Sequence, residues 1–248
     1  ITDSEQLPGL GIGDILIDPA NSNVIYIATG LKFTSGYGVG VLKTTNGTSS
    51  NPQWDFTDLS YDPFLGIMVR IRKLLMQPSN HNVVYAITDR EVYKTTDGGV
   101  NWPSFGFYNA TNNNDNIDIR NIVFDPLNNS NIIVSGYQLW RWNNSTGQWS
   151  DITSNLSTTP ISSIFLAVSG DNIYALYDYN STPYDNKIDV SSDGGITWTN
   201  LTSTNQFGPL FIVSPANPNI MYIGDGTTGR TVYKSTNGGT HFYPITYY

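Results

Sequence analysis

The sequence predicts an all-β fold, a β-propeller of four-stranded antiparallel blades with about five blades in this chain. A turn phrase recurs at intervals of about 44 to 51 residues, a period typical of propeller blades. A second, proline-centred phrase precedes each copy of the turn. No segment of useful length carries the apolar period of a helix.

The turn phrase is clearest at Lys94-Thr-Thr-Asp-Gly-Gly-Val-Asn-Trp102, with close copies at 190–198 and 234–242 and weaker ones at 43–54 and 141–149. Asp or Asn at the start of such a turn accepts hydrogen bonds from later N–H groups, and Gly adopts the positive φ angles required. The aromatic residue that follows covers the turn. We therefore predict a structural role, with no part in chemistry, for a set of turn residues: Asn46, Asp97, Gly98, Trp102, Asn144, Trp149, Asp193, Gly194, Trp198, Asn237 and Gly238.

The proline-centred phrase, for example Ile15-Leu-Ile-Asp-Pro-Ala-Asn-Ser-Asn-Val-Ile-Tyr26, predicts the inner and middle strands of each blade. The turn phrase then carries the third strand, and the alternating residues after its aromatic predict an outer strand. The predicted blades occupy roughly 10–60, 69–108, 118–156, 161–204 and 208–248.

Residues 1–9 match the outer strand and exit loop of a later blade, near 152–161. They are predicted to be the outer strand of a preceding blade or of a blade that closes a five-bladed ring. A surplus outer strand with open edges favours the first alternative, an internal segment of a larger propeller.

Composition restricts the classes of partner. The formal net charge is −8 with a sequence pI of about 4.5, and the few Lys and Arg are scattered, which argues against nucleic acid and anionic membranes as partners. No apolar run approaches the length of a membrane span, so no membrane insertion is expected. The absence of cysteine favours a prokaryotic source.

The turn phrase resembles the hairpin of the Asp-box (BNR-repeat) β-propeller superfamily, Ser/Thr-x-Asp-x-Gly-x-x-Trp. That resemblance implies the fold but not one activity, because sialidases, xyloglucanases and sortilin-type receptors share the hairpin. The sequence of residues 7–47 is similar to that of large exported BNR-repeat proteins of Bacteroidetes, many of which use type IX secretion. The resemblance thus implies a bacterial protein in an extracellular or cell-surface location.

The resemblance also directs the search for catalytic residues. Sialidases need three converging arginines and a Tyr–Glu pair, but Glu occurs only at Glu5 and Glu91, and no arginine stands in the family's phrase. Xyloglucanases place a catalytic Asp after a middle strand, and here Asp89 and Asp225 hold comparable positions. Glycoside hydrolysis would need two such carboxyl groups about 5–9.5 Å apart.

We expect neither a metal nor a cofactor. His81 and His241 are the only histidines, and both fall in turns, so neither a zinc cluster nor a Ser-His-Asp triad is expected. The asparagine-rich stretch 112–118 lacks the ligand spacing of an EF-hand.

The predicted function is that of a non-enzymatic secreted or surface propeller, which binds a protein or a glycan or serves as a structural module beside other blades or domains of its parent protein. Binding is expected at loops on one face, where insertions and exposed tyrosines gather. These tyrosines are Tyr37, Tyr108, Tyr177, Tyr179 and Tyr184. The alternative is a glycoside hydrolase of xyloglucanase type, with Asp89 and Asp225 as acid and base.

Overall fold

The computed structural model describes residues 11–30, 38–59, 61–62, 67–107, 117–179, 186–206, 208–224 and 231–245. Two compact units, Ile1–Ile119 and Arg120–Tyr248, are considered separately below. The predicted all-β propeller fold is confirmed, because the strands are antiparallel and fall into five successive blades. None of the helical segments in the described ranges has the length and apolar character of a membrane-spanning helix.

The first unit contains two blades and a small hairpin between them. Blade 1 has the strand order β1-β2-β3-β4, and blade 2 has the order β7-β8-β9. In blade 2, an isolated bridge between Tyr93 and Ser104 takes the place of a fourth strand. The hairpin β5-β6 was not predicted. The strands are β1 (Ile12–Ile17), β2 (Ile25–Thr29), β3 (Val41–Thr44), β4 (Asp55–Phe56), β5 (Tyr61–Asp62), β6 (Ile67–Met68), β7 (Lys73–Met76), β8 (Val84–Ile87) and β9 (Val92–Thr95).

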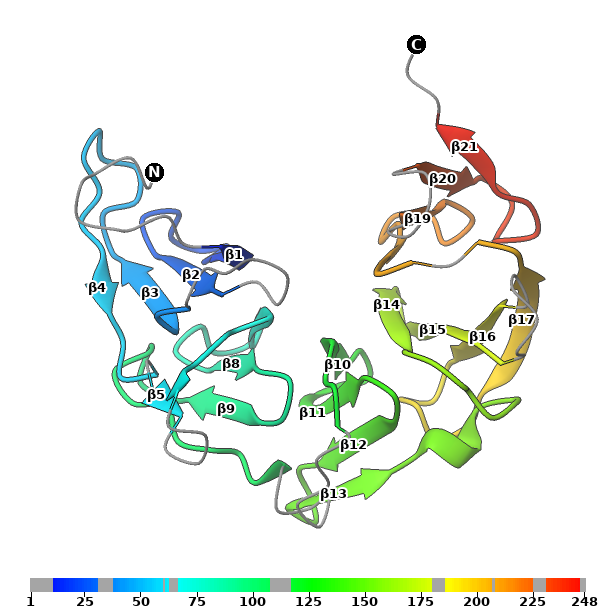
Figure 1. The fold of residues 1–248 in the computed structure, drawn as a ribbon, viewed down its shortest axis with the longest axis horizontal. Coiled ribbons are helices and arrows are strands. Elements are labelled where there is room, and N and C mark those ends of the chain that lie inside the picture. The colour runs from blue at the N-terminus through cyan, green and yellow to red at the C-terminus, as the bar shows by residue number, and fades with distance from the viewer. Residues whose placement is uncertain are drawn as a thin grey trace. The chain divides into compact units, whose positions relative to one another are not determined.

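The second unit contains three complete four-stranded blades, which Figure 1 shows in chain order from green to red. Blade 3 is formed by β10 (Asn121–Asp125), β11 (Asn128–Ser135), β12 (Leu139–Asn143) and β13 (Gln148–Asp151). After a short 3-10 turn, η1 (Thr153–Asn155), blade 4 follows as β14 (Phe165–Ser169), β15 (Asn172–Asp178), β16 (Asn186–Ser191) and β17 (Thr199–Thr204). Blade 5 comprises β18 (Leu210–Val213), β19 (Met221–Gly224), β20 (Val232–Ser235) and β21 (Tyr243–Ile245).

Apolar side chains fill the space between successive blades within each unit. In the first unit, Tyr26, Val41, Leu74 and Trp102 belong to one buried cluster that joins blades 1 and 2. In the second unit, one cluster joins blades 3 and 4, and another joins blades 4 and 5. The near-continuous apolar run of the middle strand β15 is buried because the core with blade 3 covers one of its faces and the core with blade 5 covers the other.

The turns between the third and fourth strands are closed by side chains. In blade 2, the Thr95 hydroxyl donates to Asp97 Oδ1 (2.7 Å), and the same oxygen accepts the N–H groups of Val100 and Asn101 (both 3.0 Å). The indole N–H of Trp102 donates to the Gly99 carbonyl at 3.2 Å. Both Gly98 and Gly99 have positive φ, which explains the Gly-Gly pair.

Blades 4 and 5 repeat this arrangement. Asp193 and Asn237 accept from the hydroxyls of Ser191 and Ser235 at 2.8 and 2.9 Å, and Trp198 repeats the indole bond to Gly195. In blade 1, Thr44 donates to Asn46, whose side chain also accepts the N–H of Gln53. A Ser or Thr hydroxyl and an Asp or Asn oxygen two residues later therefore close four of the five turns.

Blade 3 differs because Trp142 occupies the position that Thr95, Ser191 and Ser235 hold elsewhere. Trp142 pairs with Trp149 across β12 and β13, with ring centroids 5.6 Å apart. Without the hydroxyl, the turn is closed by Asn143, whose carbonyl accepts the Gly147 N–H at 2.8 Å and whose side chain accepts the Ser145 N–H. The expected turn residue, Asn144, instead donates its backbone N–H to Asn131.

The two repeated phrases meet at the first glycine of the turn. In blades 2 and 5, the N–H groups of Gly98 and Gly238 donate to the carbonyls of Asn82 and Asn219, the last asparagines of the proline-centred phrases. This contact holds the outer hairpin of a blade against its inner hairpin, so one phrase fixes the position of the other.

The carbonyl of that first glycine also joins its blade to the preceding one. Gly98 O accepts from Lys43 Nζ (2.7 Å) and from the Tyr26 hydroxyl (2.9 Å), both on blade 1. Gly194 O of blade 4 accepts from Arg141 Nε of blade 3 at 3.0 Å, and Arg141 also pairs with the buried Asp125 at 3.1 Å. We call this accepting group the turn carbonyl, because the same contact occurs at two blade junctions.

We predict that the turn carboxylates make the fold sensitive to acid. Hydrogen bonds from Asn101 and Thr95 lower the pKa of Asp97, and those from Thr197 and Ser191 outweigh burial and lower the pKa of Asp193. Their stabilisation is therefore present above the ordinary Asp value of 3.8 and is lost as pH falls through the depressed folded values. In the double variant Asp97→Asn/Asp193→Asn, the urea midpoint should fall less between neutral and acidic pH than in the unaltered chain. Asparagine can close such a turn, because Asn237 does so in blade 5. An unchanged pH profile would contradict this account.

Removing the guanidinium of Arg141, which joins blades 3 and 4, should destabilise the fold. Arg141→Met leaves Asp125 buried without its ion pair, so the free energy of unfolding should fall by about 3–5 kcal/mol in urea titration. The double variant Arg141→Met/Asp125→Asn removes the unpaired charge and should lose less. If the free energy of unfolding falls by as much in the double variant as in Arg141→Met and Asp125→Asn added together, the ion pair is not the cause of the destabilisation.

Candidate functional site

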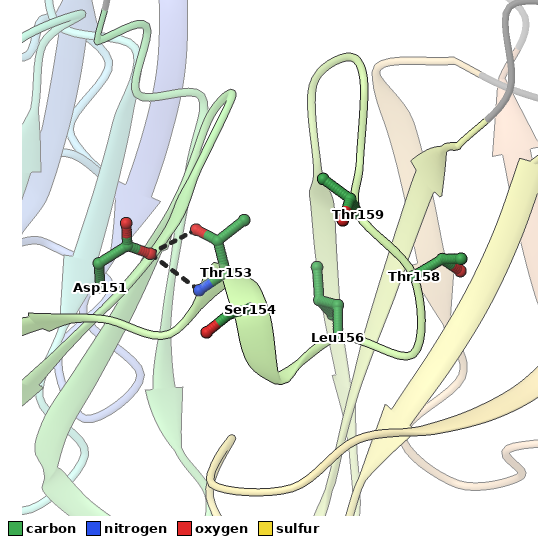
Figure 2. Close-up of a pocket in the computed structure, with 6 residues that line it drawn as sticks. All are labelled: Asp151, Thr153, Ser154, Leu156, Thr158 and Thr159. Carbon is green, nitrogen blue, oxygen red and sulfur yellow. Dashed lines mark hydrogen bonds between the residues drawn. The ribbon is translucent and has the colours of Figure 1, made fainter.

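A pocket lies in the second unit, where the chain leaves β13 and enters blade 4. Its volume is about 380 Å³. Figure 2 shows Asp151, Thr153 and Ser154 on one side of it, and Leu156, Thr158 and Thr159 on the other. The lining therefore supplies one carboxylate and the exposed hydroxyls of Ser154 and Thr159, whereas the Thr158 hydroxyl is buried and the Thr153 hydroxyl is engaged by Asp151 and Leu139.

The first side of the pocket is fixed by a local capping motif. Asp151 Oδ1 accepts both the backbone N–H and the hydroxyl of Thr153, at 2.8 and 2.5 Å, which are the dashed lines in Figure 2. The Thr153 hydroxyl in turn accepts the Leu139 N–H, and Asn155 Nδ2 donates to the Ile196 carbonyl of blade 4. The sequence Asp-Ile-Thr thus sets the direction in which the chain leaves β13.

The second side is anchored by a buried carboxylate. Asp189 is fully buried on β16 and accepts from both the N–H and the hydroxyl of Ser157 at 2.7 Å. The Tyr177 hydroxyl donates to the same carboxylate at 2.6 Å, and Asn200 Nδ2 lies at 3.3 Å. Burial raises the pKa of the Tyr177 phenol to about 12, and the bond to Asp189 acts in the same direction. The loop at Ser157, between Leu156 and Thr158, is therefore held rigidly.

The pocket also presents one carboxylate oxygen that the capping motif does not use. Asp151 Oδ2 receives no hydrogen bond from the described part of the chain, so it remains an acceptor that points away from the capping motif. Among the described residues, the lining holds one carboxylate and no His, Lys or Arg.

Asp89, the first predicted catalytic residue, lies in the first unit between β8 and β9. The preceding Thr88 hydroxyl accepts the N–H groups of Arg90 and Glu91, and the Asp89 carbonyl accepts the Ile119 N–H. The neighbouring Glu91 is buried, and its carboxylate accepts from Val92, Ser104 and Phe107. Glu91 thus holds its own loop, whereas the Asp89 side chain accepts no hydrogen bond from the described part of the chain.

Asp225, the second predicted catalytic residue, lies outside the described residues. The pairing of Asp89 with Asp225 therefore stays a prediction. The predicted turn residues, from Asn46 to Gly238, are absent from the pocket lining and lie in the turns already described.

The expectation of exposed binding tyrosines is wrong for Tyr177. Its side chain is fully buried, because its hydroxyl completes the Asp189 network and its ring belongs to the core between blades 3 and 4. Tyr179 is half-buried, with Lys187 Nζ 4.6 Å from the ring centroid. Tyr37, Tyr108 and Tyr184 lie outside the described residues.

Sequence reasoning did not identify the pocket residues Asp151, Thr153 and Thr159. The signal was the Asp-Ile-Thr cap followed by the hydroxyl-rich run Ser157-Thr-Thr159, which was assigned only to an exit loop. Within the described residues, no group of three His, Cys, Asp or Glu side chains is arranged to bind a metal. His81 is engaged by Asp18, with Nδ1 and Oδ1 2.6 Å apart.

No protein-family model matches the chain. A curated relative, the xyloglucanase Xgh74A of Acetivibrio thermocellus, is 28% identical over 227 residues, which cover 79% of this chain and 26% of that protein. The chain thus spans about a quarter of that relative's length.

Two solved structures share the fold. The GH74 xyloglucanase of Xanthomonas campestris superposes with a TM-score of 0.63 at 17% identity, over 95% of this chain and 38% of that one. The extracellular domain of a hybrid two-component system, BT3049 of B. thetaiotaomicron, gives a TM-score of 0.62 at 11% identity, over 99% and 30% of the two chains. At these identities the structural likeness shows the fold alone. The chain is therefore a β-propeller similar in sequence to part of a xyloglucanase.

Proposed function

We propose that this chain is an extracellular carbohydrate-binding propeller segment that holds a β-glucan-type polysaccharide through the pocket at Asp151. The observation that carries the proposal is a pocket that presents the Asp151 carboxylate with the exposed hydroxyls of Ser154 and Thr159, in a chain that is 28% identical to a xyloglucanase. An extracellular location is supported by the extracellular domain among the structural neighbours and by the resemblance to exported BNR-repeat proteins.

The geometry of the pocket suits a sugar, because the hydroxyl groups of a sugar donate hydrogen bonds and the pocket holds a carboxylate acceptor in a fixed position. Asp151 Oδ2 is a carboxylate acceptor, and hydrogen bonds to charged groups are stronger than those between neutral groups. Both sides of the pocket are held in advance by Asp151–Thr153 and Ser157–Asp189, so little ordering entropy is lost on binding.

A second candidate function, glycoside hydrolysis, is favoured by one observation. Asp89 follows Thr88 at the end of a middle strand, where the resemblance to xyloglucanases places a catalytic carboxylate, and the curated relative is a xyloglucanase. In this alternative, Asp89 and Asp225 act as the acid and the base. It accounts for Asp89 but gives no role to the pocket at Asp151.

Removing the charge of Asp151 should weaken polysaccharide binding. We expect Asp151→Asn to raise the Kd for a xyloglucan oligosaccharide about tenfold or more, because a hydrogen bond to a charged group contributes about 1.5–3 kcal/mol. Isothermal titration calorimetry measures the change. The matched control is Asp55→Asn, which removes an exposed carboxylate on β4 and should leave Kd unchanged. Equal affinity of Asp151→Asn and the unaltered chain would assign binding to another surface.

The reducing-end assay separates binding from hydrolysis. We expect the unaltered chain to release no reducing ends from xyloglucan or other β-glucans, and Asp89→Asn to keep the calorimetric affinity. Steady release of reducing ends that Asp89→Asn abolishes would replace the binding proposal by the hydrolase alternative. Activity that survives Asp89→Asn but not Asp151→Asn would place hydrolysis at the pocket and would contradict both assignments.

A further inference from the structure

Blade 5 carries, on its outward face, the same row of side chains that blade 1 uses to join blade 2. In blade 1, the cross-strand register aligns Leu16, Tyr26 and Lys43 in one row. In blade 5, the register aligns Ile212, Tyr222 and Lys234 in the corresponding row. Lys43 and Lys234 both stand three residues before the Asn that opens the turn of their own blade.

The two tyrosine–lysine pairs also have the same internal geometry. Lys43 Nζ lies 5.3 Å from the ring centroid of Tyr26, and Lys234 Nζ lies 5.7 Å from that of Tyr222. In blade 1, these two groups donate together to the turn carbonyl of Gly98. In blade 5, the described residues supply Lys234 with the Tyr222 ring but with no acceptor for its ammonium protons.

The surrounding surface of blade 5 is apolar where a following blade would pack. Phe211 and Val213 on β18 are buried in the core with blade 4, whereas Leu210 and Ile212 on the same strand point the other way and are 44% and 46% exposed. Tyr243, in register with Lys234, is 64% exposed. Leu16, the counterpart of Ile212, packs in the core that joins blades 1 and 2.

We propose that the Tyr222–Lys234 pair and the apolar surface formed by Leu210, Ile212 and Tyr243 are a docking site for a further blade with an Asp/Asn-Gly-Gly turn. The occupant is defined by complementarity: a glycine carbonyl accepts from Lys234 and Tyr222, and the inner strand of the incoming blade covers Leu210 and Ile212. A cation that donates to a buried carbonyl is strongly engaged, as at the two junctions inside the chain.

The first experiment uses the chain with Lys43 and Lys234 as a matched pair. We expect Lys43→Met to lower the urea midpoint and Lys234→Met to leave it unchanged. Lysine acetylation followed by mass spectrometry should modify Lys234 about tenfold or more faster than Lys43, the factor expected from one charge-assisted hydrogen bond. Equal acetylation rates, or an equal loss of midpoint, would mean that Lys234 is already engaged and would overturn the proposal.

The second experiment supplies the occupant. A copy of residues 208–245, carrying Lys234→Arg so that its peptides are distinguishable, is appended to the chain. Acetylation of the original Lys234 should slow about tenfold. A control fusion with Phe211→Lys in the appended copy cannot cover the apolar surface and should show no slowing. Equal rates in the two fusions would overturn the proposal, and so would slowing that appears when the unaltered chain is concentrated, because the occupant would then be a second copy.

Discussion

The turn carbonyl is the polar contact that joins successive blades at two junctions of this chain. A glycine with positive φ exposes a backbone oxygen that its own hairpin does not use, and the preceding blade supplies the donor: Lys43 with Tyr26 in one case and Arg141 in the other. A buried carbonyl without a partner would cost free energy, so at these two junctions the donor of the preceding blade stabilises the outer hairpin. This contact explains the cation three residues before the turn at Lys43 and Arg141.

Where one residue of the turn phrase is replaced, the local structure differs from that of the other blades. Trp142 replaces the turn hydroxyl in blade 3, and the hairpin there is closed by Asn143 and Gly147 instead of an Asp-Gly-Gly turn. Val190 replaces the cation in blade 4, and its junction with blade 5 is formed by the apolar core around Phe211 and Met221. Hydrogen bonding and apolar packing thus substitute for each other between blades of one chain.

The candidate site lies on a loop that connects two successive blades. The pocket at Asp151 is built on the exit loop between blades 3 and 4, whose two sides are fixed by a local cap and by a buried carboxylate on a neighbouring strand. Such a loop can vary in sequence without disturbing the turns, because its anchors are few and separate from its exposed hydroxyls. The polysaccharide that we propose as the ligand would contact the exposed polar groups of this loop.

The sequence by itself determined the all-β class, the five blades and the local closure of the turns at Asp97, Asp193 and Asn237, because these features depend on residues close together in the chain. Only the tertiary structure decided where long-range partners lie. Tyr177 looked like a loop aromatic but is buried, since Asp189 twelve residues later accepts its hydroxyl, and the pocket exists because Ser157 reaches the same carboxylate. The repeat period predicts which neighbouring strands pair within a blade. The pocket depends on contacts between blades, and the spacing of residues in the chain does not predict those contacts.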